Sequence, residues 1–102
     1  MEDLDLAVEV SNDLPTSFSL YQNYPNPFNP TTTIRFDVPV ASSIRLSVYD
    51  MLGRRIETLQ DQFVPAGQHS ALFNPENLST GVLLYRLETE AGTITRTMML
   101  LK

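Results

Sequence analysis

Short runs in which apolar and polar side chains alternate recur along most of the chain. In the clearest run, Ile34, Phe36 and Val38 share one parity, while Arg35 and Asp37 have the other. Successive side chains of a β-strand point to opposite faces of a sheet, so this period of two indicates half-buried strands rather than amphipathic helices. We expect strands at residues 16–22, 33–38, 44–49, 54–59, 68–73, 82–88 and 93–101.

The spacing of these runs favours one fold class. Turn residues separate strands at intervals of about eight to twelve residues, which predicts an all-β fold, an antiparallel β-sandwich of about seven strands in two sheets of similar size. A small barrel is the alternative. A chain of 102 residues with 42% hydrophobic residues can bury one modest core and forms one domain at most.

Three details of the sandwich can also be predicted. Gly53 is the residue best able to adopt positive φ in the turn after the third strand. We expect a loop from Gln60 to Gly67, which contains Pro65. The last strand is apolar on both faces over residues 98–101, so we expect it to be central or covered at its end.

One stretch fits neither a helix nor a central strand. Residues 23–30 read NYPNPFNP, and each proline fixes its own φ and lacks a backbone donor. Asparagine side chains can bond nearby backbone and form turns, so we expect a stiff, self-packed ribbon at the start of the folded domain. Tyr24 and Phe28 are its predicted packed anchors. The alternative is a polyproline ligand for an aromatic groove.

The residues before the ribbon have a different composition. Residues 1–15 carry five acidic residues and end at a proline, which indicates a linker or the tail of a preceding region, with a possible short strand at Leu4–Val10. The folded domain is expected to span residues 16–102. The start, MEDLDLAVEV, is acidic where a signal peptide is basic, so we expect the chain to be part of a longer protein.

Charge and hydropathy exclude two classes of partner. The net charge is −5 and the seven basic residues are scattered, which argues against nucleic-acid binding. No apolar run approaches the roughly 20 residues of a membrane helix, so no membrane insertion is expected. The chain lacks cysteine, which excludes disulfides and thiolate metal sites.

No set of residues predicts an enzyme or a cofactor site. His69 is the only histidine, and Ser70 beside it has the opposite parity, so a structural histidine on a half-buried strand is favoured over a catalytic one. Asp50, Glu57 and Asp61 lack the alternating spacing of a calcium loop and are better explained as solvated turn carboxylates.

Two further groups of side chains leave a choice open. Arg54 and Arg55 after the Gly53 turn could contact an acidic partner, or could deter edge-to-edge aggregation of a strand, and the two explanations carry equal weight. A carbohydrate-binding module needs exposed aromatic side chains, for which Tyr21, Tyr24 and Tyr49 are the candidates.

Five blocks, read together, carry a resemblance to a known family. They are FSLYQNYPNPFNPTTTIRFDVP, LSVYDMLGRRIETL, PAGQHSALFN, LSTGVLLYRLE and TRTMMLLK, which ends at the basic Lys102. In this order they resemble the C-terminal sorting domain of proteins exported by the bacterial type IX (Por) secretion system, a family similar to the immunoglobulin-like domains of flagellar hook-capping proteins. The signature residues are Asn23, Tyr24, Pro25, Asn26, Pro27, Phe28, Asn29, Pro30, Gly53, Arg54, Gly67, Gly81, Tyr85, Arg96 and Lys102.

The resemblance implies an adaptor rather than an enzyme. It implies an immunoglobulin-like sandwich that follows an N-terminal cargo domain and is recognised by the translocon at the outer membrane of a Gram-negative bacterium. Cleavage by a sortase-like peptidase, which attaches cargo to the surface, is then expected around Asp13 to Gln22. The cargo is expected to cross the periplasm and the outer membrane and to be secreted or displayed. The alternative function is an accessory carbohydrate-binding or structural module of a secreted hydrolase.

Overall fold

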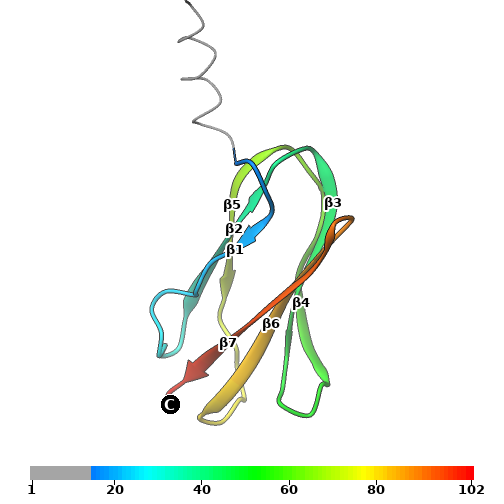
Figure 1. Ribbon diagram of the computed structural model, residues 1–102. Coiled ribbons are helices and arrows are strands. Elements are labelled where there is room, and N and C mark those ends of the chain that lie inside the picture. Colours follow the sequence, from blue (N-terminus) through cyan, green and yellow to red (C-terminus); the bar gives the residue numbers. More distant parts are fainter. Residues whose placement is uncertain (1–14) are drawn as a thin grey trace, which may run out of the picture.

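The computed structural model describes residues 15–102, which form seven β-strands and no helix (Figure 1). The expected strand at Leu4–Val10 and most of the expected linker lie outside the described residues. The strands are β1 (Ser19–Leu20), β2 (Thr32–Val38), β3 (Ser42–Tyr49), β4 (Arg55–Val64), β5 (Gly67–Phe73), β6 (Gly81–Thr89) and β7 (Gly92–Leu100).

The strands form two antiparallel sheets packed face to face, which confirms the predicted sandwich. One sheet has the order β1-β2-β5 and the other the order β4-β3-β6-β7. An immunoglobulin constant-type sandwich places its fourth strand with the first, second and fifth, whereas here β4 lies beside β3. The two sheets are consistent with an immunoglobulin-like sandwich whose fourth strand has changed sheets.

The core lies between the sheets and follows the alternation of the sequence. On β2, Ile34, Phe36 and Val38 are fully buried, and on β6, Leu83, Tyr85 and Leu87 face the same interior. Each buried leucine- or phenylalanine-sized side chain contributes roughly 1.5–3 kcal/mol relative to exposure. The predicted core parity is therefore confirmed on these strands.

Two strand predictions are corrected in length. The expected strand at residues 16–22 is reduced to the two residues of β1, because beyond Leu20 the contact with β2 continues only as separate backbone bonds, one from Tyr21 and a pair at Tyr24. The expected loop from Gln60 to Gly67 is wrong, since β4 continues to Val64 and pairs with β3 from Arg55 to its end. Polar residues are compatible with this segment because β4 is an edge strand with one face toward solvent.

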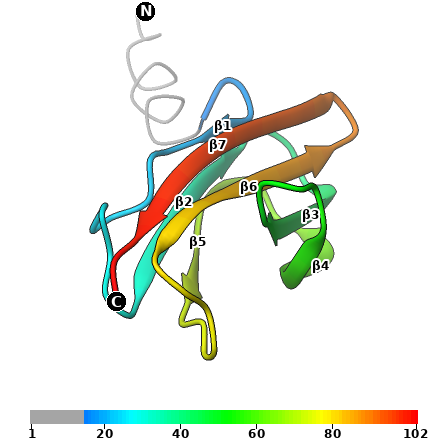
Figure 2. The ribbon, with the colours of Figure 1, turned by 90° about the horizontal axis from the view of Figure 1, so that it is seen from below.

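The last strand is at an edge and is covered at its end, so the central position is the part of that prediction that is wrong. β7 pairs with β6 on one side over its whole length. On its other side β7 faces the segment that follows β1, as Figure 2 shows from below. This arrangement brings the first and last parts of the domain together.

The antiparallel path gives the sandwich two distinct ends. One end, which we call the linker end, contains the start of the described chain and the β2–β3, β4–β5 and β6–β7 connections (Figure 1). The other, which we call the ribbon end, contains residues 23–30, the β3–β4 turn, the β5–β6 connection and the C-terminus. Over residues 15–102 there is no helix of the length and apolarity needed to cross a membrane.

Candidate functional site

The proline ribbon, Asn23–Pro30, lies along the free edge of β7. The Phe28 backbone N–H donates to the Met99 carbonyl at 2.9 Å, and the Leu101 N–H donates back to the Phe28 carbonyl at 2.9 Å. Next to these two bonds, the Met99 N–H donates to Oδ1 of Asn26 at 2.9 Å. An edge strand presents unpaired backbone groups, and here the ribbon satisfies them over the last residues of β7.

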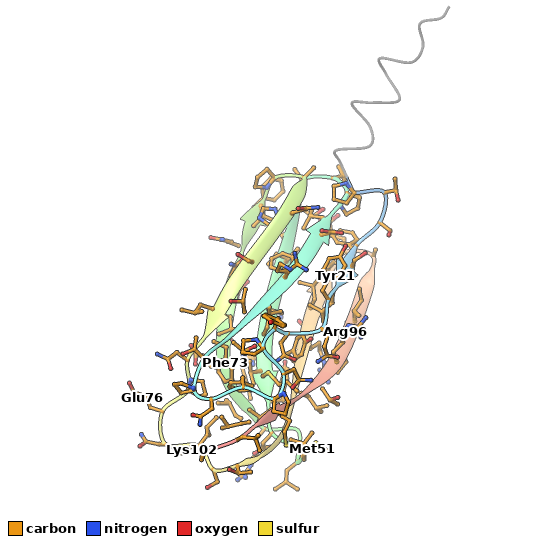
Figure 3. The ribbon with its side chains drawn as sticks, turned by 90° about the vertical axis from the view of Figure 1, so that its left-hand side faces the viewer. Tyr21, Met51, Phe73, Glu76, Arg96 and Lys102 are labelled. Carbon is orange, nitrogen blue, oxygen red and sulfur yellow. The ribbon has the colours of Figure 1, made fainter. Side chains whose placement is uncertain are left out.

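Residues flanking this contact extend the junction along β7. Nε2 of Gln22 donates to the Thr97 carbonyl at 2.8 Å. Nε of Arg96 donates to the Leu20 carbonyl, so an exposed arginine on β7 binds the end of β1 (Figure 3). The edge of β7 is thereby tied to the N-terminal part of the domain from Arg96 to its end.

Phe28 is the packed anchor of the ribbon. Its side chain is 1% exposed and belongs to the core. Its ring packs against that of Phe73 with centroids 6.0 Å apart and an angle of 58° between the planes. This is a tilted geometry that aromatic pairs favour. The prediction for Phe28 is confirmed.

The prediction that Tyr24 is also a packed anchor is wrong, because its side chain is 81% exposed. The reason is its backbone pairing, because the N–H and C=O of Tyr24 exchange hydrogen bonds of 3.0 and 2.9 Å with Thr33. Directly paired residues point to the same face, and Thr33 lies on the face of β2 opposite to the buried Ile34. Tyr24 is therefore directed to solvent.

Asn23 is buried at 2% exposure and organises the start of the ribbon. Its Nδ2 donates to the Pro25 carbonyl at 3.1 Å and to Oγ1 of Thr32 at 3.0 Å. Its backbone N–H donates to the Tyr85 hydroxyl at 2.9 Å, and that hydroxyl donates to the Tyr21 carbonyl at 2.6 Å. Burial raises the pKa of Tyr85. These internal bonds support a self-packed ribbon over a polyproline ligand.

The remaining ribbon residues are exposed. Pro25, Pro27 and Pro30 each follow a cis peptide bond. Asn26 and Asn29 are exposed, although Asn26 contacts β7 as described. The ribbon thus combines two buried side chains with a surface formed by its other residues.

The β3–β4 turn is the second ordered feature of the ribbon end. One carboxylate oxygen of Asp50 accepts the backbone N–H groups of Leu52 and Arg54, each at 2.9 Å, and the other accepts Nε of Arg54 at 2.7 Å. The backbone N–H of Arg54, followed by its side chain and the N–H of Leu52, holds the pKa of Asp50 below its usual value. Gly53 has φ +87°, as predicted.

Two signature glycines are far apart. Gly81 starts β6 opposite Leu100, close to where the ribbon meets β7. Gly67 pairs with Val38 and lies at the linker end with φ +137°. The C-terminal Lys102 is at the ribbon end, where its N–H donates to Oγ1 of Thr80 at 2.8 Å (Figure 3). All signature residues except Gly67 thus lie at the ribbon end or on β6 and β7.

The residues considered for chemistry form no site of their own. His69 is half-buried on β5, as expected, with its ring stacked on Phe36 and its Nε2 2.8 Å from the Pro65 carbonyl. Among residues 15–102 no three His, Cys, Asp or Glu side chains are grouped as metal ligands. Asp50 instead shapes its turn.

The three tyrosines considered for carbohydrate binding form no common platform. Tyr49 is only 7% exposed and lies beneath the guanidinium of Arg86, which is 4.7 Å from its ring centroid. The Tyr21 hydroxyl donates to Asp37, and this bond, ahead of partial desolvation, raises the pKa of Tyr21. Tyr24 alone projects freely, so the geometry does not favour a glycan site.

Sequence reasoning missed Gln22, whose side chain bonds the edge of β7. It included Asn26 among the signature residues but did not predict its bond to Met99. Both partners are more than seventy residues away along the chain, and no local pattern reveals such contacts. Asp50 was expected as a turn carboxylate, and the structure adds the bonds by which it shapes the turn.

A comparison with models of known protein families identifies the family of this chain. The family model described as "secretion system C-terminal sorting domain" matches residues 22–101, which is well over half of the 102 residues and includes the ribbon and β2 to β7. No curated protein matches the chain. The chain therefore belongs to the family of secretion system C-terminal sorting domains, non-catalytic tails that mark cargo for export by the type IX secretion system.

Proposed function

We propose that the export machinery recognises the ribbon end of the sandwich. The observation that carries the proposal is the convergence of the ribbon, the end of β7 and the β3–β4 turn at one end. The described chain begins at the opposite end (Figure 1). Cargo joined there leaves the ribbon end free for a translocon subunit.

The linker end is where a sortase-like peptidase has access to the chain. Thr16 and Ser17 are exposed, whereas Leu20 is 3% exposed and its carbonyl accepts a hydrogen bond from Arg96. A peptidase that cuts after β1 must disrupt the pairing of β1 with β2 and the Arg96 bond. We therefore narrow the expected cleavage region to the part that precedes Ser19, so that the unit removed from the cargo contains all seven strands.

A reporter fusion tests the function. Residues 14–102 are placed behind a signal peptide and a reporter enzyme in a bacterium that has a type IX secretion system. We expect the reporter at the cell surface or in the medium, after passage through the periplasm and the outer membrane. Folded reporter that stays in the periplasm would contradict the proposal.

Point variants then test which end is recognised. Tyr24→Ala and Asn29→Ala alter exposed side chains of the ribbon, and Val40→Ala alters a 61% exposed side chain at the linker end. Substitutions at exposed positions usually change stability by less than about 0.5 kcal/mol, so folding is preserved in all three. We expect the two ribbon variants to lower export and Val40→Ala to leave it unchanged; equal export of all three contradicts recognition of the ribbon end.

Mass spectrometry of the released tail tests the cleavage region. We expect its N-terminus to lie between residues 14 and 19. A tail that begins within residues 20–22 would show that the peptidase opens the β1 pairing, and the narrowed region would be wrong.

A further inference from the structure

The tip of the β3–β4 turn exposes two large apolar side chains. Met51 is 61% exposed and Leu52 is 79% exposed, and both lie at the ribbon end (Figures 1 and 3). The turn itself needs only a carboxylate at Asp50 and a residue at position 53 that tolerates positive φ. Polar residues at positions 51 and 52 would satisfy this turn equally well, so folding does not explain their apolar character.

The turn holds these side chains in a fixed arrangement. Besides the three bonds to the Asp50 carboxylate, the Asp50 N–H donates to the Arg54 carbonyl at 2.9 Å and the Gly53 N–H donates to the Asp50 carbonyl at 3.0 Å. A segment that is ordered before binding loses less conformational entropy when it binds. Exposed apolar side chains on an ordered support are the usual form of an anchor at a protein interface.

Basic side chains flank the apolar tip. The Arg54 side chain is 75% exposed and the adjacent Arg55 is also exposed. Only Nε of Arg54 is bonded to Asp50, which leaves the rest of its guanidinium toward solvent. An apolar pair beside two guanidinium groups is complementary to an apolar pocket with carboxylates at its rim.

We propose that Met51 and Leu52 insert into an apolar pocket, rimmed by carboxylates, on a protein of the export machinery. This inference rests on recognition of the ribbon end and specifies one contact of it. A lipid surface is the less favourable occupant, because one myristoyl chain gives only marginal membrane binding and these two side chains together contain fewer carbon atoms.

Export of the same reporter fusion, followed over time, tests the anchor. Leu52→Ser and Met51→Ser remove the apolar groups, Leu52→Met keeps one, and Val40→Ser is the matched loss of an exposed apolar side chain at the linker end. We expect Leu52→Ser to slow export about tenfold or more, because burial of a leucine side chain corresponds to at least that factor in affinity. Leu52→Met, which keeps an apolar side chain of similar volume, should export faster than Leu52→Ser, and Val40→Ser should export at the unaltered rate.

Charge variants test the rim of the pocket. We expect Arg55→Glu to slow export and Arg55→Lys to retain it, since only the first reverses the charge. Circular dichroism and thermal unfolding of each purified variant confirm that its fold is intact. Equal export of Arg55→Glu and Arg55→Lys would overturn the acidic rim.

The outcomes separate this inference from the proposed function. If the unaltered fusion is not exported, recognition of the domain itself fails. If the unaltered fusion is exported and Leu52→Ser, Met51→Ser and the variant with both changes match its rate, only the proposed insertion of Met51 and Leu52 is wrong. Binding of the purified protein to phosphatidylethanolamine–phosphatidylglycerol vesicles that is lost in Leu52→Ser would overturn the protein pocket in favour of a membrane surface.

Discussion

Replacement of Phe28 by alanine tests whether the proline ribbon is part of the folded core. Phe28 is 1% exposed, and its ring contacts Phe73 across the end of the sandwich. Phenylalanine-to-alanine changes at such sites cost about 3–5 kcal/mol, which combines lost transfer free energy with the cavity left behind. Folding free energies of domains are about 5–15 kcal/mol, so this loss is a large share of the total.

Urea unfolding followed by far-UV circular dichroism measures the effect. We expect the unfolding midpoint of Phe28→Ala to fall strongly while the slope with denaturant stays constant, because the slope follows the surface exposed on unfolding. In a thermal scan the loss corresponds to a decrease in Tm of at least about 12 °C for a domain of this size. Tyr24→Ala is the matched control, since its side chain is 81% exposed and should change stability by less than about 0.5 kcal/mol.

The reasoning is refuted if Phe28→Ala and Tyr24→Ala unfold at the same midpoint. The ribbon would then not pack in solution, and a linear recognition motif would explain it better. If Phe28→Ala does not fold at all, Phe28→Leu provides the measurement. It keeps most of the apolar volume, and we expect it to lose about 1.5 kcal/mol or less, still more than the tyrosine control.

Three further changes probe the hydrogen bonds and turns that hold the site. Tyr85→Phe should cost about 1–3 kcal/mol in urea unfolding, because the buried N–H of Asn23 loses its acceptor. The raised pKa of Tyr85 means that stability is full below about pH 10 and falls as pH rises beyond it, a loss that Tyr85→Phe should reduce. Asp50 has a lowered pKa, so its contribution is present above its usual value of 3.8 and is lost as pH falls below it; Asp50→Asn should flatten this acid limb in thermal unfolding. Gly53→Ala should lower stability by about 1 kcal/mol through backbone strain, since no atom outside the adjacent residues lies within 4 Å of the added methyl group, and urea unfolding measures it.

The sequence predicts those parts of the fold in which one local pattern determines the structure. Alternation sets which side chains of β2, β5 and β6 face the core, because a half-buried strand cannot shift by one residue without exposing its apolar face. The turn at Gly53 is predictable for the same reason, since few residues tolerate positive φ. Both features depend on near neighbours in the chain.

Where the local pattern is ambiguous, pairing with a distant strand determines whether a segment is a strand or a loop. Residues 60–64 resemble a loop by composition, yet they pair with β3 as the end of an edge strand. Gln60 even reaches the other sheet, where Nε2 donates to the Ser70 carbonyl at 3.1 Å. A polar strand of this kind has no signature of its own until its partner is known.

In the ribbon, too, the directions of the side chains depend on partners that are distant in the sequence. Prolines interrupt the period of two, so the sequence does not reveal that Phe28 faces inward and Tyr24 outward. The pairing of Tyr24 with Thr33 and the bridge from Phe28 to Leu100 fix these directions. Both partners lie outside the ribbon, and the second lies at the far end of the chain.

The number of strands accounts for the separation between cargo and the proposed recognition surface. Consecutive strands of this sandwich run in opposite directions, so a domain with an odd number of strands begins at one end and finishes at the other (Figure 1). β1 has only two residues, yet it carries the chain from the linker end toward the ribbon end, where the ribbon meets the finish of β7. The short first strand therefore places the ribbon at the end of the sandwich opposite to the start of the described chain, where the cargo is proposed to be joined.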